Sequence, residues 1–121
     1  MVPPCAPLAR FIVCFVAMLL PATCGAEDLN APTPQEAADI RLWIPHQCCV
    51  TNDCCRKVHE SALILLPGDL VRVAATGQVL PRTGWSRDGQ TWRCACDFVD
   101  GQWVVHSGAN TRCVFPVPAG S

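Results

Sequence analysis

Hydrophobic and polar residues alternate most regularly in the C-terminal third of the chain, around the Asp-Gly pairs at 88–89 and 100–101. Asp-Gly between alternating residues is a strong signal for a two-residue hairpin turn. Each pair therefore predicts two antiparallel strands in a fixed register. The expected cross-strand pairs are Trp85 with Trp92, Phe98 with Trp103, and Cys96 with Val105.

A third turn at 108–110 extends the pattern into a β-meander, with Val105 facing Cys113 and Trp103 facing Phe115. Because side chains alternate in direction along a strand, the three registers together define one core face and one solvent face. The expected core face holds Trp85, Trp92, Cys94, Cys96, Phe98, Trp103, Val105, Cys113, Phe115 and Val117. The expected solvent face holds Arg93, Asp97, Gln102, His106 and Arg112.

The N-terminal part predicts one short helix, roughly over 34–43. Thr33 and Glu36 form a capping-box pattern with Pro34 at the first helical position. Ala37, Ile40 and Ile44 recur at helical spacing, and Pro45 disfavours helix at the residue before it. We expect one face of this helix to pack on the sheet.

Between these regions, residues 48–55 are rich in turn formers and predict an irregular loop. Apolar runs at 62–66, 70–73 and 79–80, separated by Pro-Gly-Asp and Thr-Gly, predict three further strands. The sequence thus predicts a small disulfide-rich α+β fold, mainly β, with a short N-terminal helix packed on an antiparallel β-meander.

The first 26 residues have the pattern of a secretory signal peptide: Arg10 as the one charge, an apolar run over 11–20, and small residues up to Ala26. The apolar run is far shorter than the roughly 20 residues of a membrane-spanning helix. We therefore expect a periplasmic or secreted protein with no membrane span after cleavage. The expected organisation is signal peptide 1–26, disordered linker 27–33, a single domain 34–117, and a frayed tail 118–121.

Charge identifies no partner. The chain has 9 basic and 10 acidic side chains and a net charge of −1, without a basic cluster. Nucleic-acid binding and attraction to anionic membranes both depend on clustered Lys and Arg. The composition therefore argues against nucleic acid, and no motif in the chain indicates a cofactor.

The chain has ten cysteines, of which seven follow the predicted leader. An exported chain of this length is expected to use them as disulfides, since its hydrophobic core alone is marginal. On the predicted sheet, Cys96 and Cys113 lie two strands apart, and Cys94 and Cys96 are poorly aimed at each other along one strand, so neither pair should bond. The three sheet cysteines should therefore bond to the cluster at 48–55, leaving one cluster cysteine unpaired. The candidate disulfide residues are Cys48, Cys49, Cys54, Cys55, Cys94, Cys96 and Cys113.

Two alternatives use the same cysteines. In the first, the seven thiolates with His46 bind copper or zinc, metals that thiolate and imidazole ligands suit. In the second, Cys94-Ala95-Cys96 or the spare thiol exchanges disulfides with a partner. The usual Cys-x-x-Cys spacing of zinc knuckles and redox motifs is absent from the chain, which disfavours both.

No residue pattern marks a catalytic site. The serines lack the context of a nucleophile elbow, and the tryptophans are expected mostly in the core rather than stacked on a ligand. The function expected from the residues is therefore that of a non-enzymatic envelope or interaction protein. Its partner is an unidentified protein or envelope component, and the unpaired cysteine is open to an intermolecular disulfide.

Three motifs resemble those of a group of small exported cysteine-rich proteins of Gram-negative bacteria, which are uncharacterised. They are Cys48-Cys49-x-x-x-Asp53-Cys54, a cysteine after a hairpin at 94 or 96, and Cys113-Val114-Phe115-Pro116, within residues 43–116. The sequence departs from that pattern in Cys55 and in the second cysteine of Cys94-Ala95-Cys96. The resemblance implies export and cysteine cross-linking, and it implies no activity.

Overall fold

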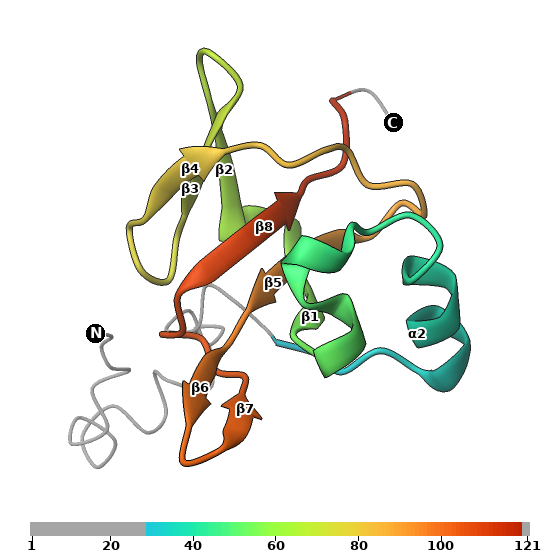
Figure 1. The fold of residues 1–121 in the computed structure, drawn as a ribbon. Coiled ribbons are helices and arrows are strands. Elements are labelled where there is room, and N and C mark those ends of the chain that lie inside the picture. The colour runs from blue at the N-terminus through green and yellow to red at the C-terminus, as the bar shows by residue number, and fades with distance from the viewer. Residues whose placement is uncertain (1–28, 120–121) are drawn as a thin grey trace, which may run out of the picture.

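The computed structural model describes residues 29–119, so the predicted signal peptide lies outside the described residues. Within 29–119 the chain forms one α-helix and eight short strands (Figure 1). The elements are α2 (Pro34–Ile40), β1 (Cys55–Val58), β2 (Leu63–Leu66), β3 (Leu70–Val73), β4 (Val79–Pro81), β5 (Thr91–Ala95), β6 (Asp97–Val99), β7 (Gln102–Val104) and β8 (Thr111–Phe115), with 3-10 helices η2 (His46–Cys48), η3 (Val50–Asn52) and η4 (Glu60–Ala62). No helix in this range is long and apolar enough to cross a membrane.

Helix α2 begins as the sequence predicts. The Thr33 hydroxyl accepts the Glu36 amide at 3.2 Å, and the Glu36 carboxylate accepts the Thr33 amide at 2.9 Å. The helix ends at Ile40, earlier than expected, and the chain tightens into a turn in which the Trp43 amide bonds to the Ile40 carbonyl. The amides of Leu42 and Trp43 bond three residues back, to the carbonyls of Asp39 and Ile40, so a turn takes the place of the last predicted helical residues.

The preceding segment makes specific contacts as well. Asn30, which the sequence assigned to a disordered linker, forms an isolated bridge with Lys57 of β1 through two backbone hydrogen bonds of 2.9 and 3.0 Å. The side chain of Leu29 packs against a cluster of buried aliphatic residues that includes Val58 of β1 and Val71 of β3. Leu29 and Asn30 therefore make specific contacts ahead of the helix.

The strands form three separate antiparallel sheets. The first has the order β1-β5-β8, the second has the order β2-β3-β4, and β6 and β7 form a two-stranded ribbon. The second sheet follows the strands predicted from the apolar runs at 62–66, 70–73 and 79–80. In Figure 1 the ribbon projects below the central strands, and α2 lies on the opposite side of the molecule from β4.

The predicted meander is wrong apart from its middle hairpin. The turn at 100–101 pairs Phe98 with Trp103 as expected, but the predicted pair of Cys96 with Val105 does not form. Strand β8 pairs with β5 rather than β7, so Trp92 faces Phe115 and Cys94 faces Cys113.

The first predicted hairpin is replaced by a turn closed by a side chain. The Asp88 carboxylate accepts the Trp92 indole N–H at 2.9 Å and the Gln90 amide at 3.0 Å. Residues before it run along the outer edge of β8 instead, where the amides of Thr83 and Ser86 bond to carbonyls of that strand and its extension. Trp85 is therefore not opposite Trp92.

Two groups of buried side chains cover the two faces of the β1-β5-β8 sheet. The disulfide core joins one face to α2 and the loop after it; it comprises Ile40, Ile44, Cys48, Val50, Cys55, Trp92, Cys94, Cys113 and Phe115. The aliphatic core joins the other face to the second sheet; it comprises Val58, Ala62, Leu63, Val71, Val73 and Val114. The central sheet is therefore buried on both sides.

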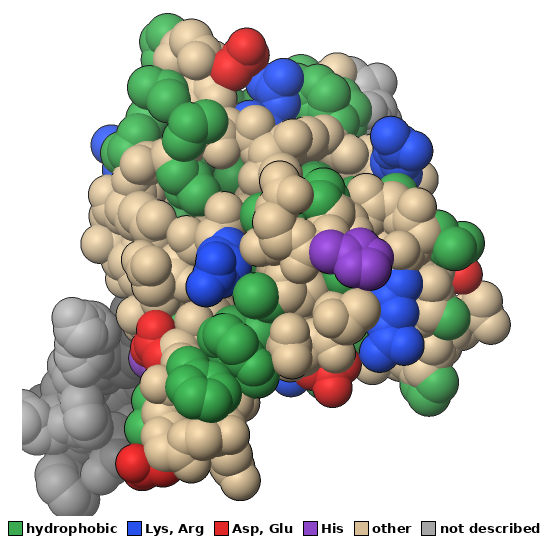
Figure 2. Space-filling model, viewed as in Figure 1, with side chains coloured by type: hydrophobic (Ala, Val, Ile, Leu, Met, Phe, Trp, Pro, Cys, Tyr) green, Lys and Arg blue, Asp and Glu red, His purple; other side chains and the backbone are tan. Residues whose placement is uncertain are grey.

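Because the central sheet is buried on both sides, the predicted solvent face is wrong for β5. Arg93, expected in water, is fully buried, and its side chain bonds to the segment at 107–111 that leads into β8. Phe98 and Trp85, expected in the core, are 61% and 38% exposed. Phe98 lies on the projecting ribbon, where Figure 2 shows hydrophobic side chains at the surface.

Candidate functional site

Three disulfides join the 48–55 loop to the C-terminal third: Cys48–Cys113, Cys54–Cys96 and Cys55–Cys94. Each links one loop cysteine to one of the three downstream cysteines, as the sequence argument expected. Their Cα–Cα separations are 5.6, 5.5 and 3.9 Å, and all six residues are buried. The loop is therefore fixed covalently at both of its ends.

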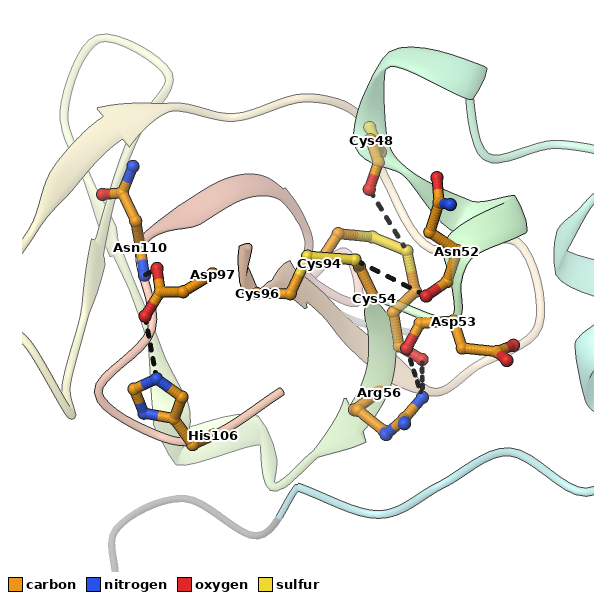
Figure 3. The surroundings of a disulfide bond; sticks show 11 residues. Cys48, Asn52, Asp53, Cys54, Arg56, Cys94, Cys96, Asp97, His106 and Asn110 are labelled. Carbon is orange, nitrogen blue, oxygen red and sulfur yellow. Dashed lines mark hydrogen bonds and ion pairs between the residues drawn. A yellow bond between two sulfur atoms is a disulfide. The ribbon is translucent and has the colours of Figure 1, made fainter. Parts of the chain in front are cut away.

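The local backbone explains how so many neighbouring cysteines reach different partners. Cys49 and Asp53 both have left-handed conformations, with φ of 61° and 59°, and each ends a short 3-10 helix. After the second reversal, adjacent Cys54 and Cys55 bond to different partners: Cys54 to Cys96, between β5 and β6 (Figure 3), and Cys55 to Cys94 of β5. Arg56 closes the turn by donating to the Asp53 carbonyl at 2.7 Å.

Cys49 is the thiol that the odd cysteine count predicted. Among the cysteines within 29–119 it alone is outside a disulfide, and it is partly exposed. The neighbouring Cys48 is bonded to Cys113, so the two adjacent cysteines have different chemistry.

The predicted metal ligands are mostly consumed by these bonds. Six of the seven candidate cysteines are in disulfides, which leaves Cys49 and the exposed His46. Residues 29–119 contain no group of three or more His, Cys, Asp or Glu side chains arranged to hold an ion. In the redox alternative, Cys94 and Cys96 are each bonded to the loop and not to each other.

Asp97, which follows Cys96 in the chain, forms a polar pair with His106. The Asp97 carboxylate lies 2.8 Å from Nε2 of His106 and accepts the Asn110 amide at 3.4 Å (Figure 3). The hydrogen bond from His106, followed by that from Asn110, lowers the pKa of Asp97 below its ordinary value. Both side chains are substantially exposed, as the sequence predicted for this face.

The buried polar network around Arg93 was missed. Its guanidinium donates to the Thr111 hydroxyl at 2.7 Å and to the carbonyls of Ser107 and Ala109 at 2.9 and 2.7 Å. These bonds hold the segment entering β8 beside β5. Regular alternation assigned Arg93 to solvent, and no local signal in the sequence marks it as buried.

Shallow depressions lie around this scaffold. One of about 540 Å³ includes Cys113 in its wall, together with Gln47, Arg82 and Arg112. Another is lined by Trp43, Trp85 and Phe115, and a third lies beside His59 and the chain after β8. Of these, the first is in contact with a disulfide cysteine.

No protein-family model, curated protein or solved structure matches this chain. The resemblance to small exported cysteine-rich proteins therefore stays an expectation from the sequence.

Proposed function

We propose that this protein is an exported, disulfide-stabilised interaction protein of the bacterial envelope without catalytic activity of its own. The observation that carries the proposal is the set of three buried disulfides, each joining the 48–55 loop to the C-terminal third. Disulfides of this kind persist in oxidising compartments, which agrees with the signal-peptide pattern of residues 1–26.

Two surface features support an interaction role. The β6-β7 ribbon presents exposed Phe98, Val99 and Val104, which is unusual for large apolar side chains on a short projecting element. Cys49 supplies a partly exposed thiol on a loop that the disulfides hold in place. We propose that the ribbon makes non-covalent contact with an envelope component and that Cys49 is open to a mixed disulfide with a partner.

The test is the intact mass of protein recovered from the periplasmic fraction, alkylated before and after reduction. The proposal expects a chain lacking the leader, lighter by six hydrogens than its reduced form, with one thiol alkylated without reduction and mapped to Cys49. A full-length chain with ten alkylatable thiols in the cytoplasmic fraction would contradict it. A bound copper or zinc ion with reduced cysteines would instead favour the metal-binding alternative.

The interaction surface is tested separately, by thiol trapping in whole cells. Wild type and Cys49→Ser are compared on non-reducing gels, with Phe98→Ser and Val104→Ser as ribbon variants. The proposal expects a higher-mass adduct that disappears in Cys49→Ser and is reduced in the ribbon variants. An adduct equally abundant in the ribbon variants would contradict the role of the ribbon.

A further inference from the structure

Cys94 lies between two other cysteines at the same level of the central sheet. Residue 55 of β1 is its direct partner on one side, and residue 113 of β8 is its direct partner on the other. All three side chains belong to the disulfide core, so they point to the same face. Cys94 is bonded to Cys55, while Cys113 is bonded to Cys48 in the loop.

Both neighbours are within reach of Cys94. Directly opposite residues of an antiparallel pair have Cβ atoms about 4.5–5.5 Å apart, against about 3.5–4.5 Å in a disulfide, so a bond requires the two strands to approach by about 1 Å. The register therefore supports a second pairing, Cys94–Cys113, in place of Cys55–Cys94. A thiolate on Cys113 would have the sulfur of Cys94 as its nearest cross-strand target.

The Cys48–Cys113 bond is also the one that borders the depression described above. Arg82 and Arg112 line that depression, and among the described residues of its wall there is no acidic side chain. The charge of Arg82 is partly neutralised by an ion pair with Asp69 at 2.9 Å. We therefore assign the greater share of the positive charge at the depression to Arg112. Positive charge beside a disulfide attracts an attacking thiolate and stabilises the thiolate that leaves.

We propose that Cys48–Cys113 is an exchangeable disulfide, reduced at this depression by a dithiol partner, and that the Cys55–Cys94 bond then migrates to Cys94–Cys113. The inference goes beyond the proposed interaction function, because it assigns a reaction to bonds which that function treats as structural.

The reaction has two stages. In the first, one thiolate of the partner attacks Cys113 Sγ, and Cys48 leaves as a thiolate; the partner's second thiolate then displaces Cys113. The partner becomes a disulfide, having supplied two electrons, and its two protons pass to the released sulfurs. In the second, the Cys113 thiolate attacks Cys94 Sγ, a new S–S bond forms, and Cys55 leaves as a thiolate and takes up a proton. The second stage consumes no electrons.

The product would gain a cross-link between β5 and β8, which no disulfide joins in the structure, and the first part of the loop would be freed. Cys48, Cys49 and Cys55 would then all carry thiols, with Cys54–Cys96 still holding the loop's far end. The central sheet is preserved and the loop is released.

Limited reduction with dithiothreitol tests the proposal on the oxidised mature protein. A Cys49→Ser background removes the spare thiol, and the species that has gained two hydrogens is trapped by alkylation and mapped by mass spectrometry. The proposal expects alkyl groups on Cys48 and Cys55 and a Cys94–Cys113 cross-link. Alkyl groups on Cys48 and Cys113 would overturn the migration, and groups on Cys54 and Cys96 would overturn the choice of bond.

Two matched variants in the same background test the register without a reductant. Cys48→Ser leaves Cys113 unpartnered and is expected to give a mixture that contains Cys94–Cys113 with Cys55 free. Cys54→Ser leaves Cys96 unpartnered; it lies outside the row of three and is expected to stay free, with the other two bonds unchanged. Cys55–Cys94 as the sole pairing in Cys48→Ser would overturn the proposal, and the dithiothreitol experiment decides if that variant does not fold.

The charge of the depression is tested by rates. Arg112→Glu should slow the first reduction by dithiothreitol by about threefold or more, because it repels the attacking thiolate. Arg41→Glu makes the same charge change at an exposed residue outside the depression's wall and should change the rate much less. Equal slowing in both variants would overturn the role of the depression.

Discussion

Single side chains connect elements that are distant in sequence. Glu36 accepts the Thr33 amide, forms an ion pair with Lys57 at 2.8 Å, and accepts the Gln90 side-chain amide at 3.2 Å. One carboxylate thus links the start of α2 to β1 and to the turn before β5. Arg93 has a comparable role in the interior, where it fixes the approach to β8.

Glu36→Gln tests the carboxylate. The hydrogen bond from Lys57, and next the one from the Thr33 amide, lower the pKa of Glu36 below its ordinary 4.5. The ionised carboxylate therefore stabilises the folded state above that value, and the effect is lost as the pH falls through the lower pKa of the folded protein. Urea unfolding should show the variant less stable than wild type near pH 7, with the difference vanishing well below pH 4. Glu60→Gln, which removes the same charge from an exposed side chain, is the control; a difference that persists in acid would contradict the prediction.

Arg93→Met tests the buried guanidinium. The variant keeps much of the apolar volume but leaves buried acceptors at Ser107, Ala109 and Thr111 without their donor. We expect the free energy of unfolding to fall by about 3 kcal/mol. Arg87→Met, at an exposed position, should change it by less than about 0.5 kcal/mol. Equal effects of the two substitutions in urea titrations would argue against the network.

At the scale of elements, the sequence predicts local structure correctly and predicts the pairing of distant strands wrongly. The capping box at Thr33, the turn at 100–101 and the apolar runs of the second sheet all act between residues close in sequence, and each is confirmed. Strand β1 was missed because its polar sequence resembles a loop, although it fills one edge of β5. Once β1 and β8 take both edges of β5, no edge remains for the predicted hairpin partner.

Strand pairing also determines which features of the disulfide site the sequence can predict. The sequence excludes two pairs, Cys94–Cys96 and Cys96–Cys113, and predicts that the three downstream cysteines bond to the loop, which is confirmed. It does not exclude the third pair, Cys94 with Cys113, which the observed register places directly opposite each other. The identity of Cys49 as the unpaired thiol and the row of Cys55, Cys94 and Cys113 did not follow, because both depend on which strands flank β5. Spacing along the chain does not determine that choice.

Gln78 is the link between the second sheet and β8. Its side chain accepts the Thr111 amide and donates to the Thr111 carbonyl, both at 3.0 Å, as a neighbouring strand would. Gln78→Ala should lower the free energy of unfolding by about 1–2 kcal/mol and speed hydrogen exchange at the Thr111 amide. Gln102→Ala, on an exposed residue of the ribbon, is the matched control. Unchanged exchange at Thr111 would contradict this role.

At the scale of the whole molecule, two small cores depend on covalent support. Closing a 39-residue separation, as Cys55–Cys94 does, stabilises a fold by about 4 kcal/mol in the chain-entropy description. That value is comparable to the whole net stability of many small domains.

Full reduction should therefore unfold the chain. We expect reduction followed by alkylation of all six linked cysteines to abolish the cooperative thermal transition followed by circular dichroism. Alkylation of the oxidised protein, which modifies Cys49 among the described cysteines, should leave the transition in place. A reduced chain that still unfolds cooperatively would show that the cores suffice without the disulfides.

The order of the disulfides along the chain has a consequence for synthesis. The bonds are nested: Cys55–Cys94 lies within Cys54–Cys96, which lies within Cys48–Cys113. No native bond can close until residue 94 has been made, 39 residues after Cys55, which takes about 2–8 s at the usual rates of synthesis. Among residues 29–93 the four loop thiols have only one another as partners, so any bond formed among them in that interval is non-native. We expect the innermost native bond to form first and the outer bonds to follow, with catalysed isomerisation of any non-native bond. The appearance of the C-terminal third therefore limits how early native disulfides can form.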